Sequence, residues 1–187
     1  MQEFFSLVMK MIPHGFPLDG EERPKTLVFQ GENDHKVPVA NSLFRSTCFY
    51  KCIGRMIAHY FLHAGSPLFG ISKVVVDYLV CDKDEIPLIE VVDIPDIDLR
   101  IALNELNSLG KDEAPGTALK DVLTQYRDEA SILDTSFSGA NCHVIAQQIV
   151  LHAVITRRKS KLQDLANGMN EFGLVDFSKK HKDVVQP

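Results

Sequence analysis

Apolar residues recur every three to four positions along most of the 187-residue chain, which is the spacing of one face of an α-helix. Pro, Gly, Ser, Asp and Asn separate the segments that have this pattern, and these residues begin or end helices. The pattern predicts helices over residues 2–12, 42–64, 71–81, 93–109, 117–126, 141–155 and 157–172, with Ser72 as the cap of the third and Asn141 as the cap of the sixth. We therefore expect a mainly α (α+β) fold, a multi-helix bundle.

Two short runs depart from the helical spacing. Residues 26–30 and 35–39 are rich in β-forming side chains, and Gly31 to Asp34 between them supply turn chemistry. Pro38 cannot donate to a strand ladder, so the returning strand is expected at an edge. The sequence thus predicts one small β-hairpin. The length suits a single domain over 1–187.

The segment 46–61 is apolar around most of its circumference, which is typical of a central, buried helix capped by Asn41 or Ser42. Free cysteine is among the most buried residue types, so we expect Cys48 and Cys52 in the core. Gly54 costs this helix about 1 kcal/mol relative to Ala. We infer that its missing side chain lets another segment approach closely.

Charge and composition exclude several classes of protein. A net charge of -5, from 25 acidic and 20 basic residues, argues against a nucleic-acid partner. No apolar run is long enough to span a bilayer, and the first residues lack the positive charge of a signal peptide. The four cysteines have irregular spacing and are expected to be reduced. We expect a cytoplasmic or nuclear protein with no membrane partner.

The candidate reactive side chains lie mainly on the helix around residue 50. Cys48 could gain from the helix dipole, but a catalytic thiol also needs exposure, so core packing is the favoured interpretation. His59 and His63 share one helical face, yet the Glu of a zinc-protease motif and a second ligand pair are missing. A histidine pair that faces solvent or a neighbouring loop is favoured. Cys142 and His143 are adjacent and point in different directions on a helix.

Charged clusters suggest no chemistry either. The basic run 156–161 could be a nuclear address or a polyanion patch, but a solvated helix face is favoured. Acidic residues near helix starts are expected to interact with helix dipoles; they are Asp82, Asp84, Glu85, Glu90, Asp93, Asp96 and Asp98. No Gly-rich phosphate loop follows a strand. We expect no catalytic residue, cofactor or metal site, and the sequence assigns no partner-binding residue.

Four segments resemble the N-terminal lobe of a HECT-type ubiquitin ligase, and are most similar to the divergent HECT-like proteins of fish. Residues 3–7 resemble the Arg-Glu-Phe-Phe opening helix, with Gln2 in place of the basic residue. Residues 29–42 resemble the hairpin and its Pro-Asn exit. Residues 49–57 resemble the Phe-x-x-x-Gly-Arg core helix. Residues 150–173 resemble the closing helices, which usually read Gln-x-x-x-Phe-x-x-Gly.

This resemblance implies a scaffold that recruits a ubiquitin-conjugating enzyme. The family's reactive cysteine lies in a second, C-terminal lobe within His-Thr-Cys-Phe-Asn, and we expect that lobe to be absent here. Ser46 to Phe49 imitate the motif in the wrong lobe, so Cys48 is not assigned as the nucleophile. The family's docking subdomain corresponds to residues 110–140, which are short and lack its strand-rich pattern. The alternatives are a non-catalytic interaction module derived from the HECT fold, and a cysteine enzyme using Cys48 with His59 or His63.

Overall fold

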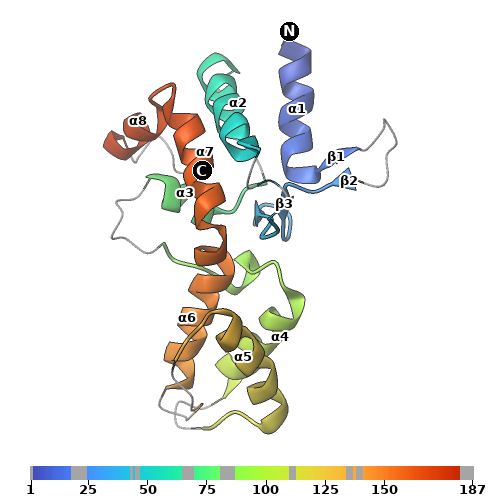
Figure 1. The fold of residues 1–187 in the computed structure, drawn as a ribbon, viewed down its shortest axis with the longest axis vertical. Coiled ribbons are helices and arrows are strands. Elements are labelled where there is room, and N and C mark those ends of the chain that lie inside the picture. Colours follow the sequence, from blue (N-terminus) through green and yellow to red (C-terminus); the bar gives the residue numbers. More distant parts are fainter. Residues whose placement is uncertain are drawn as a thin grey trace. The chain divides into compact units, whose positions relative to one another are not determined.

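The computed structural model describes residues 2–17, 25–42, 44, 47–64, 70–80, 87–109, 113–133, 137 and 141–181. These residues are mainly helical, with two small antiparallel strand pairs, so the predicted fold class is confirmed (Figure 1). The chain forms two compact units. The first unit comprises Met1–Leu88 with Arg158–Pro187, and the second comprises Ile89–Arg157. The hydrophobic pattern gave no sign of this division.

The first unit opens with α1, Gln2–His14, which runs past the predicted end at residue 12. Pro13 lies inside the helix, in its last turn. Gly15 closes the helix in the left-handed region, at φ 88°, and its N–H donates to the Met11 carbonyl at 2.8 Å. The helix therefore stops at glycine, which accepts this conformation without strain, rather than at proline.

Two strand pairs follow α1. The predicted hairpin is present as β3, Phe29–Gln30, paired with β4, Val37–Pro38. The other pair joins β1, Phe16–Pro17, to β2, Lys25–Thr26, where the sequence indicated a loop and part of the hairpin. Strands of two residues carry too little alternation to be recognised from the sequence.

Helix α2, Phe49–Ala64, begins later than predicted, and Asn41 and Ser42 lie outside it. Cys48 stands immediately before the helix at φ 51°, and its carbonyl accepts the N–H of Cys52 at 3.0 Å. The predicted cap at residue 41 or 42 is therefore wrong. The first turn of the helix is closed by this backbone bond.

The prediction of a helix buried all round, with two core cysteines, is also wrong. Both Cys48 and Cys52 are exposed. A single stripe of α2 is buried, formed by Tyr50, Ile53, Gly54, Ile57 and Ala58. The prediction failed because the exposed face of α2 also carries apolar residue types, namely Cys, Phe and Met. The sequence therefore shows no difference in polarity between the exposed and the buried face of this helix.

The remaining helices of the first unit are shorter. Helix α3, Lys73–Val80, is capped as predicted, because the Ser72 hydroxyl accepts the N–H of Val74 at 3.1 Å. Helix α7, Lys159–Asn170, follows the single 3₁₀ turn η2, Thr156–Arg158, close to the predicted bounds. Helix α8, Leu174–Lys180, was missed. It has seven residues, which is too short for a reliable helical period.

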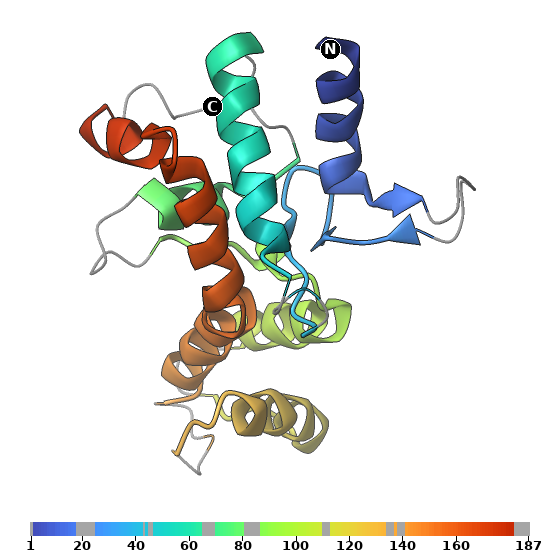
Figure 2. The ribbon, with the colours of Figure 1, turned by 45° about the horizontal axis from the view of Figure 1, so that its top comes forward.

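Helix α2 lies between α1 and α7 in both ribbon views (Figures 1 and 2). It meets α7 at two glycines. A Cβ atom on Gly54 would stand 2.2 Å from the Leu165 carbonyl oxygen, and a Cβ on Gly168 would stand 2.0 Å from the Lys51 carbonyl oxygen. Each glycine therefore makes room for the backbone of the other helix, as inferred from the sequence for Gly54.

The second unit is built from the 3₁₀ turn η1, Val91–Asp93, and helices α4, Ile97–Ser108, α5, Thr117–Glu129, and α6, Cys142–Val154. Helix α4 starts after Pro95 and not at Asp93, because Asp96 caps it by accepting the N–H groups of Asp98 and Leu99. Helix α6 begins after Asn141 as predicted. The buried residues of the second unit include Leu99, Leu103, Leu106, Leu119, Leu123, Ile145 and Ile149.

We predict that Gly54→Ala and Gly168→Ala each destabilise the protein by about 1–3 kcal/mol or more. Alanine normally favours a helix, but here its Cβ would collide with backbone atoms of the facing helix, which cannot rotate away. Gly54→Leu should cost more than Gly54→Ala. Thermal or urea unfolding measures the change.

The control is Gly116→Ala, since a Cβ at Gly116 meets nothing within 4 Å and its φ of -63° suits any residue. It should leave the unfolding free energy nearly unchanged. A melting temperature equal to that of the native protein in Gly54→Ala would show that α2 and α7 do not cross at these glycines.

Candidate functional site

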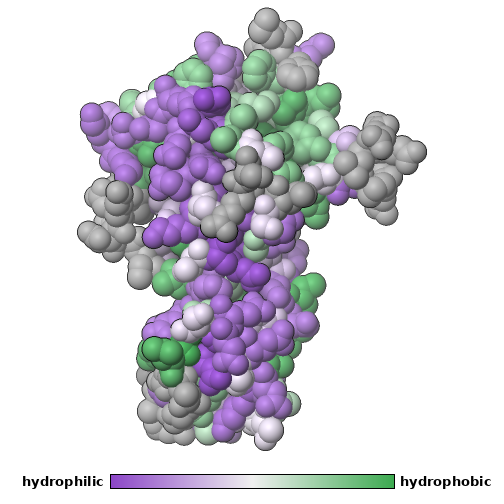
Figure 3. All heavy atoms as spheres, in the orientation of Figure 1, coloured by the Kyte–Doolittle hydropathy of each residue, from purple (hydrophilic) through white to green (hydrophobic). Residues whose placement is uncertain are grey.

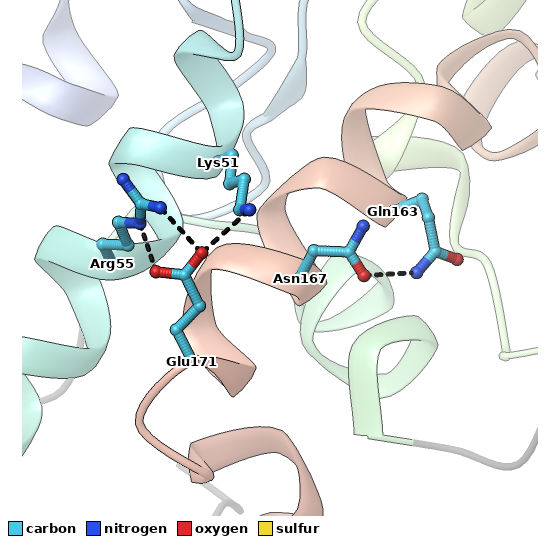
Figure 4. A network of polar contacts seen from close by, with 5 residues as sticks. All are labelled: Lys51, Arg55, Gln163, Asn167 and Glu171. Atoms are coloured by element: carbon cyan, nitrogen blue, oxygen red, sulfur yellow. Dashed lines mark hydrogen bonds and ion pairs between the residues drawn. The ribbon is translucent and has the colours of Figure 1, made fainter.

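The polar edge of the α2–α7 contact is the most developed cluster of charged side chains in the first unit (Figure 4). Arg55 of α2 donates through Nη2 to Oε1 of Glu171 at 2.8 Å and through Nε to Oε2. The Nζ of Lys51, one turn earlier, lies 2.9 Å from Glu171 Oε1. Gln163 and Asn167 of α7 are joined beside this group by a bond of 3.0 Å. Two cations thus share one carboxylate just beyond the glycine crossing.

The cluster shifts the pKa values of its members. The hydrogen bonds from Arg55, and then from Lys51, lower the pKa of Glu171 to about 2. The hydrogen bond to Glu171 likewise raises the pKa of Arg55. Because these side chains are largely open to water, the pairs stabilise the fold only slightly. They fix the alignment of the two helices and hold no carboxyl group available for acid catalysis.

The basic run was predicted to be a solvated helix face, and this is wrong for two of its residues. Arg158 is 1% exposed and Lys161 is 4% exposed. Arg158 Nε donates to the Pro38 carbonyl at 2.5 Å, and Lys161 Nζ donates to the Ala40 carbonyl at 3.1 Å. A buried cation needs hydrogen-bond acceptors in place of water. These two hydrogen bonds therefore join the start of α7 to the residues at the end of β4.

Tyr50 of α2 contacts the β3–β4 strand pair and the residue before it. Its hydroxyl donates to the Val28 carbonyl at 2.7 Å, and its ring packs edge-on against Phe29. Burial raises the pKa of Tyr50 well above its ordinary value near 10. The hydroxyl therefore stays protonated and acts as a structural donor, not as a general base.

The exposed thiols lie away from the histidines considered as their catalytic partners. Residues 48 and 59 are eleven positions apart along α2, which corresponds to about 16 Å at the rise of an α-helix. Cys52 and His59 are seven positions apart, or about 10 Å. A base must lie within hydrogen-bond reach of its nucleophile. The pairing of Cys48 with His59 or His63 is therefore not possible within this helix.

His59 and His63 are instead part of an aromatic cluster. Their ring centroids lie 4.3 Å apart. The ring of Phe5 stacks on His59 at 4.8 Å, and Phe172 meets His59 edge-on at 6.3 Å. The predicted pair on one face is confirmed, and its neighbours are α1 and the segment after α7.

The other candidates have structural roles or fall outside the described residues. Cys142 is buried and the adjacent His143 is half-buried. Asp96 caps α4, and buried Asp93 accepts the N–H of Glu90 at 2.9 Å, as expected for acidic residues at helix starts. Asp82, Asp84 and Glu85 lie outside the described residues.

Apolar side chains gather over α1 and the adjoining part of α2 on the face drawn in Figure 3. Leu7 is 57% exposed and Leu62 is 54% exposed. A hollow of about 480 Å³ lies on α1, lined by Glu3, Ser6, Leu7 and Lys10. Its mixed lining indicates a surface depression and not an enclosed binding pocket.

Neither a membrane-spanning helix nor a cluster of metal-binding side chains is present in the described ranges. None of the helices in them is long and apolar enough to cross a membrane. Within the same ranges, His, Cys, Asp and Glu do not gather in groups of three or more that could hold a metal ion.

We predict that Cys48 and Cys52 react with iodoacetamide in the native protein at rates close to those of the denatured chain, because both are exposed. Cys142 is 1% exposed and should react slower by about a hundredfold or more, through local opening. Peptide mass spectrometry after timed alkylation measures each site. Equal rates at Cys48 and Cys142 would contradict the placement, and a rate at Cys48 far above that of the denatured chain would indicate an activated nucleophile.

We also predict that Glu171 titrates near pH 2 instead of near 4.5, as followed by carboxyl NMR. Its folded pKa is the lower one, so its contribution to stability is present above about pH 4.5 and is lost as the pH falls toward 2. Arg55→Met should raise the pKa of Glu171 more than Lys51→Met does. Lys73→Met, which breaks the separate pair with Asp77, should leave Glu171 unchanged.

Comparison with known proteins gave no match: no family model, no curated protein and no solved structure is similar to this chain.

Proposed function

We propose that this chain is a HECT-like scaffold that recruits a ubiquitin-conjugating enzyme and contributes no catalytic cysteine of its own. The observation that supports the proposal is the meeting of segments that resemble the HECT N-terminal lobe. Gly54 comes from the Phe-x-x-x-Gly-Arg segment and Gly168 from the closing segment, and each makes room for the other helix. A likeness confined to isolated segments would not require this reciprocal fit.

A second contact adds to this support. Arg158 and Lys161, at the start of the closing segment, donate to the carbonyls of Pro38 and Ala40 at the exit of the hairpin. Three of the four similar segments are thus joined through backbone groups in the first unit. Packing of this kind makes a rigid frame on which another protein can be held.

The docking region proposed from the resemblance, residues 110–140, lies within the second unit, Ile89–Arg157, and we extend the proposal to that unit. In the family the conjugating enzyme docks on a subdomain inserted before the Asn-led helix, and here α6 follows Asn141. On α4, Ile97 is 61% exposed and Ile101, one turn later, is 60% exposed. Two neighbouring apolar side chains on one helical face suit an apolar contact with a partner.

The alternative is a non-catalytic interaction module derived from the same fold. It is favoured by the helical character of the second unit, whose described residues form helices and 3₁₀ turns with no strand among them. The family's docking subdomain is strand-rich. A changed docking region is compatible with a partner outside the ubiquitin pathway.

The test is binding of the purified chain to a panel of ubiquitin-charged conjugating enzymes, measured by surface plasmon resonance. We expect at least one to bind, and the double variant Ile97→Asp with Ile101→Asp to weaken that binding by about tenfold or more through lost apolar contact.

Leu7→Asp is the matched control, since it places the same charge on an exposed apolar side chain of α1. It should leave the affinity unchanged. Failure of every conjugating enzyme to bind would remove the recruitment role. Recovery of only unrelated partners in a pull-down would favour the interaction module.

A further inference from the structure

The histidine pair of α2 has a geometry that the scaffold role does not use. His59 and His63 stand one turn apart, with ring centroids at 4.3 Å and ring planes inclined by 41°. His59 is half-buried, and His63 is exposed near the C-terminal end of the helix. The two imidazoles therefore lie side by side near the end of α2, one of them open to solvent.

Aromatic rings restrain one member of the pair. Phe5 of α1 stacks on His59 with a centroid distance of 4.8 Å and an interplanar angle of 14°. Phe172 packs against the same imidazole at 6.3 Å and 77°. A ring held between two phenyl groups has few other rotamers, so little conformational entropy is lost when it binds a ligand. Exposed His63 can adjust to complete the contact.

We propose that His59 and His63 form a two-imidazole site for a divalent late transition-metal ion. Neutral imidazole suits Ni²⁺, Cu²⁺ and Zn²⁺, and histidines four positions apart on a helix present two ligands on one face. The ion would bridge two side chains within one turn and so stabilise the end of α2.

The spacing of the rings fits this chemistry. With metal–nitrogen bonds of about 2.0–2.1 Å, two imidazoles in adjacent positions of an octahedral or square-planar ion place their centroids roughly 4.5 Å apart. The observed separation of the two ring centroids, 4.3 Å, is close to this value.

The site is open. The described residues place no group of three or more His, Cys, Asp or Glu around an ion, so water would fill the other coordination positions. A two-ligand site of this kind binds more weakly than a closed four-ligand structural site, and its metal is accessible to a further ligand. The proposal thus concerns a reversible surface site and not a structural zinc.

The experiment is a titration of the untagged, metal-free chain with Ni²⁺, followed by isothermal calorimetry. Cys48→Ser and Cys52→Ser form the background, because both exposed thiols could compete for metal. We expect one equivalent to bind. We also expect Ni²⁺ to broaden the imidazole NMR signals of His59 and His63 and to raise the melting temperature, since the ion binds the folded state.

His63→Ala and His59→Ala should each lower the Ni²⁺ affinity by about a hundredfold, because the second contact is then no longer intramolecular. His63 is exposed, so its removal leaves the fold intact, and circular dichroism checks His59→Ala. The control His14→Ala removes an exposed histidine from α1 and should bind Ni²⁺ as the background does. The proposal is overturned if no Ni²⁺ binds, or if His63→Ala retains the background affinity.

Discussion

The close crossing of α2 and α7 is the constraint on which the first unit depends. Gly54 and Gly168 bring the two backbones so near that a single methyl group on either would overlap a carbonyl oxygen. Dispersion contacts fall off steeply with distance, so an approach of this kind gains packing along the whole helix pair. It also fixes the relative position of the helices, because backbone atoms cannot relax as side chains do. The polar and aromatic contacts around the crossing have a defined geometry for this reason.

Charged groups at the two sides of the crossing act differently because their exposure differs. Lys51, Arg55 and Glu171 lie at the surface, where water weakens ion pairs and the net stabilisation is small. Arg158 and Lys161 are buried and donate to backbone carbonyls, which replace hydrogen bonds that these cations would otherwise make to water. The buried pair therefore specifies how the strand exit meets α7, whereas the surface cluster only restrains the alignment of α2.

The side of α2 that does not pack against α7 carries the potentially reactive side chains of this helix. Cys48 and Cys52 are exposed near one end, and His59 and His63 are grouped near the other. Their separation along the helix rules out a thiol–imidazole catalytic pair and leaves each group with its own chemistry. On the second unit, α4 exposes Ile97 and Ile101, which are the residues of the proposed docking surface. The proposed functions therefore use residues that take no part in the contact between α2 and α7 at Gly54 and Gly168.

The sequence by itself determined the helical class, most helix positions, the Ser72 cap and the need for close approach at Gly54, because these follow from local periodicity and from the properties of single residues. It did not determine which face of α2 is buried, since Cys, Phe and Met give no polarity contrast. It also could not reveal that Arg158 and Lys161 are buried, because their carbonyl partners lie about 120 residues away. The β1–β2 pair and α8 were too short for a period to be read. Only the tertiary structure decided the buried face of α2 and the burial of Arg158 and Lys161, because these depend on partners distant in sequence.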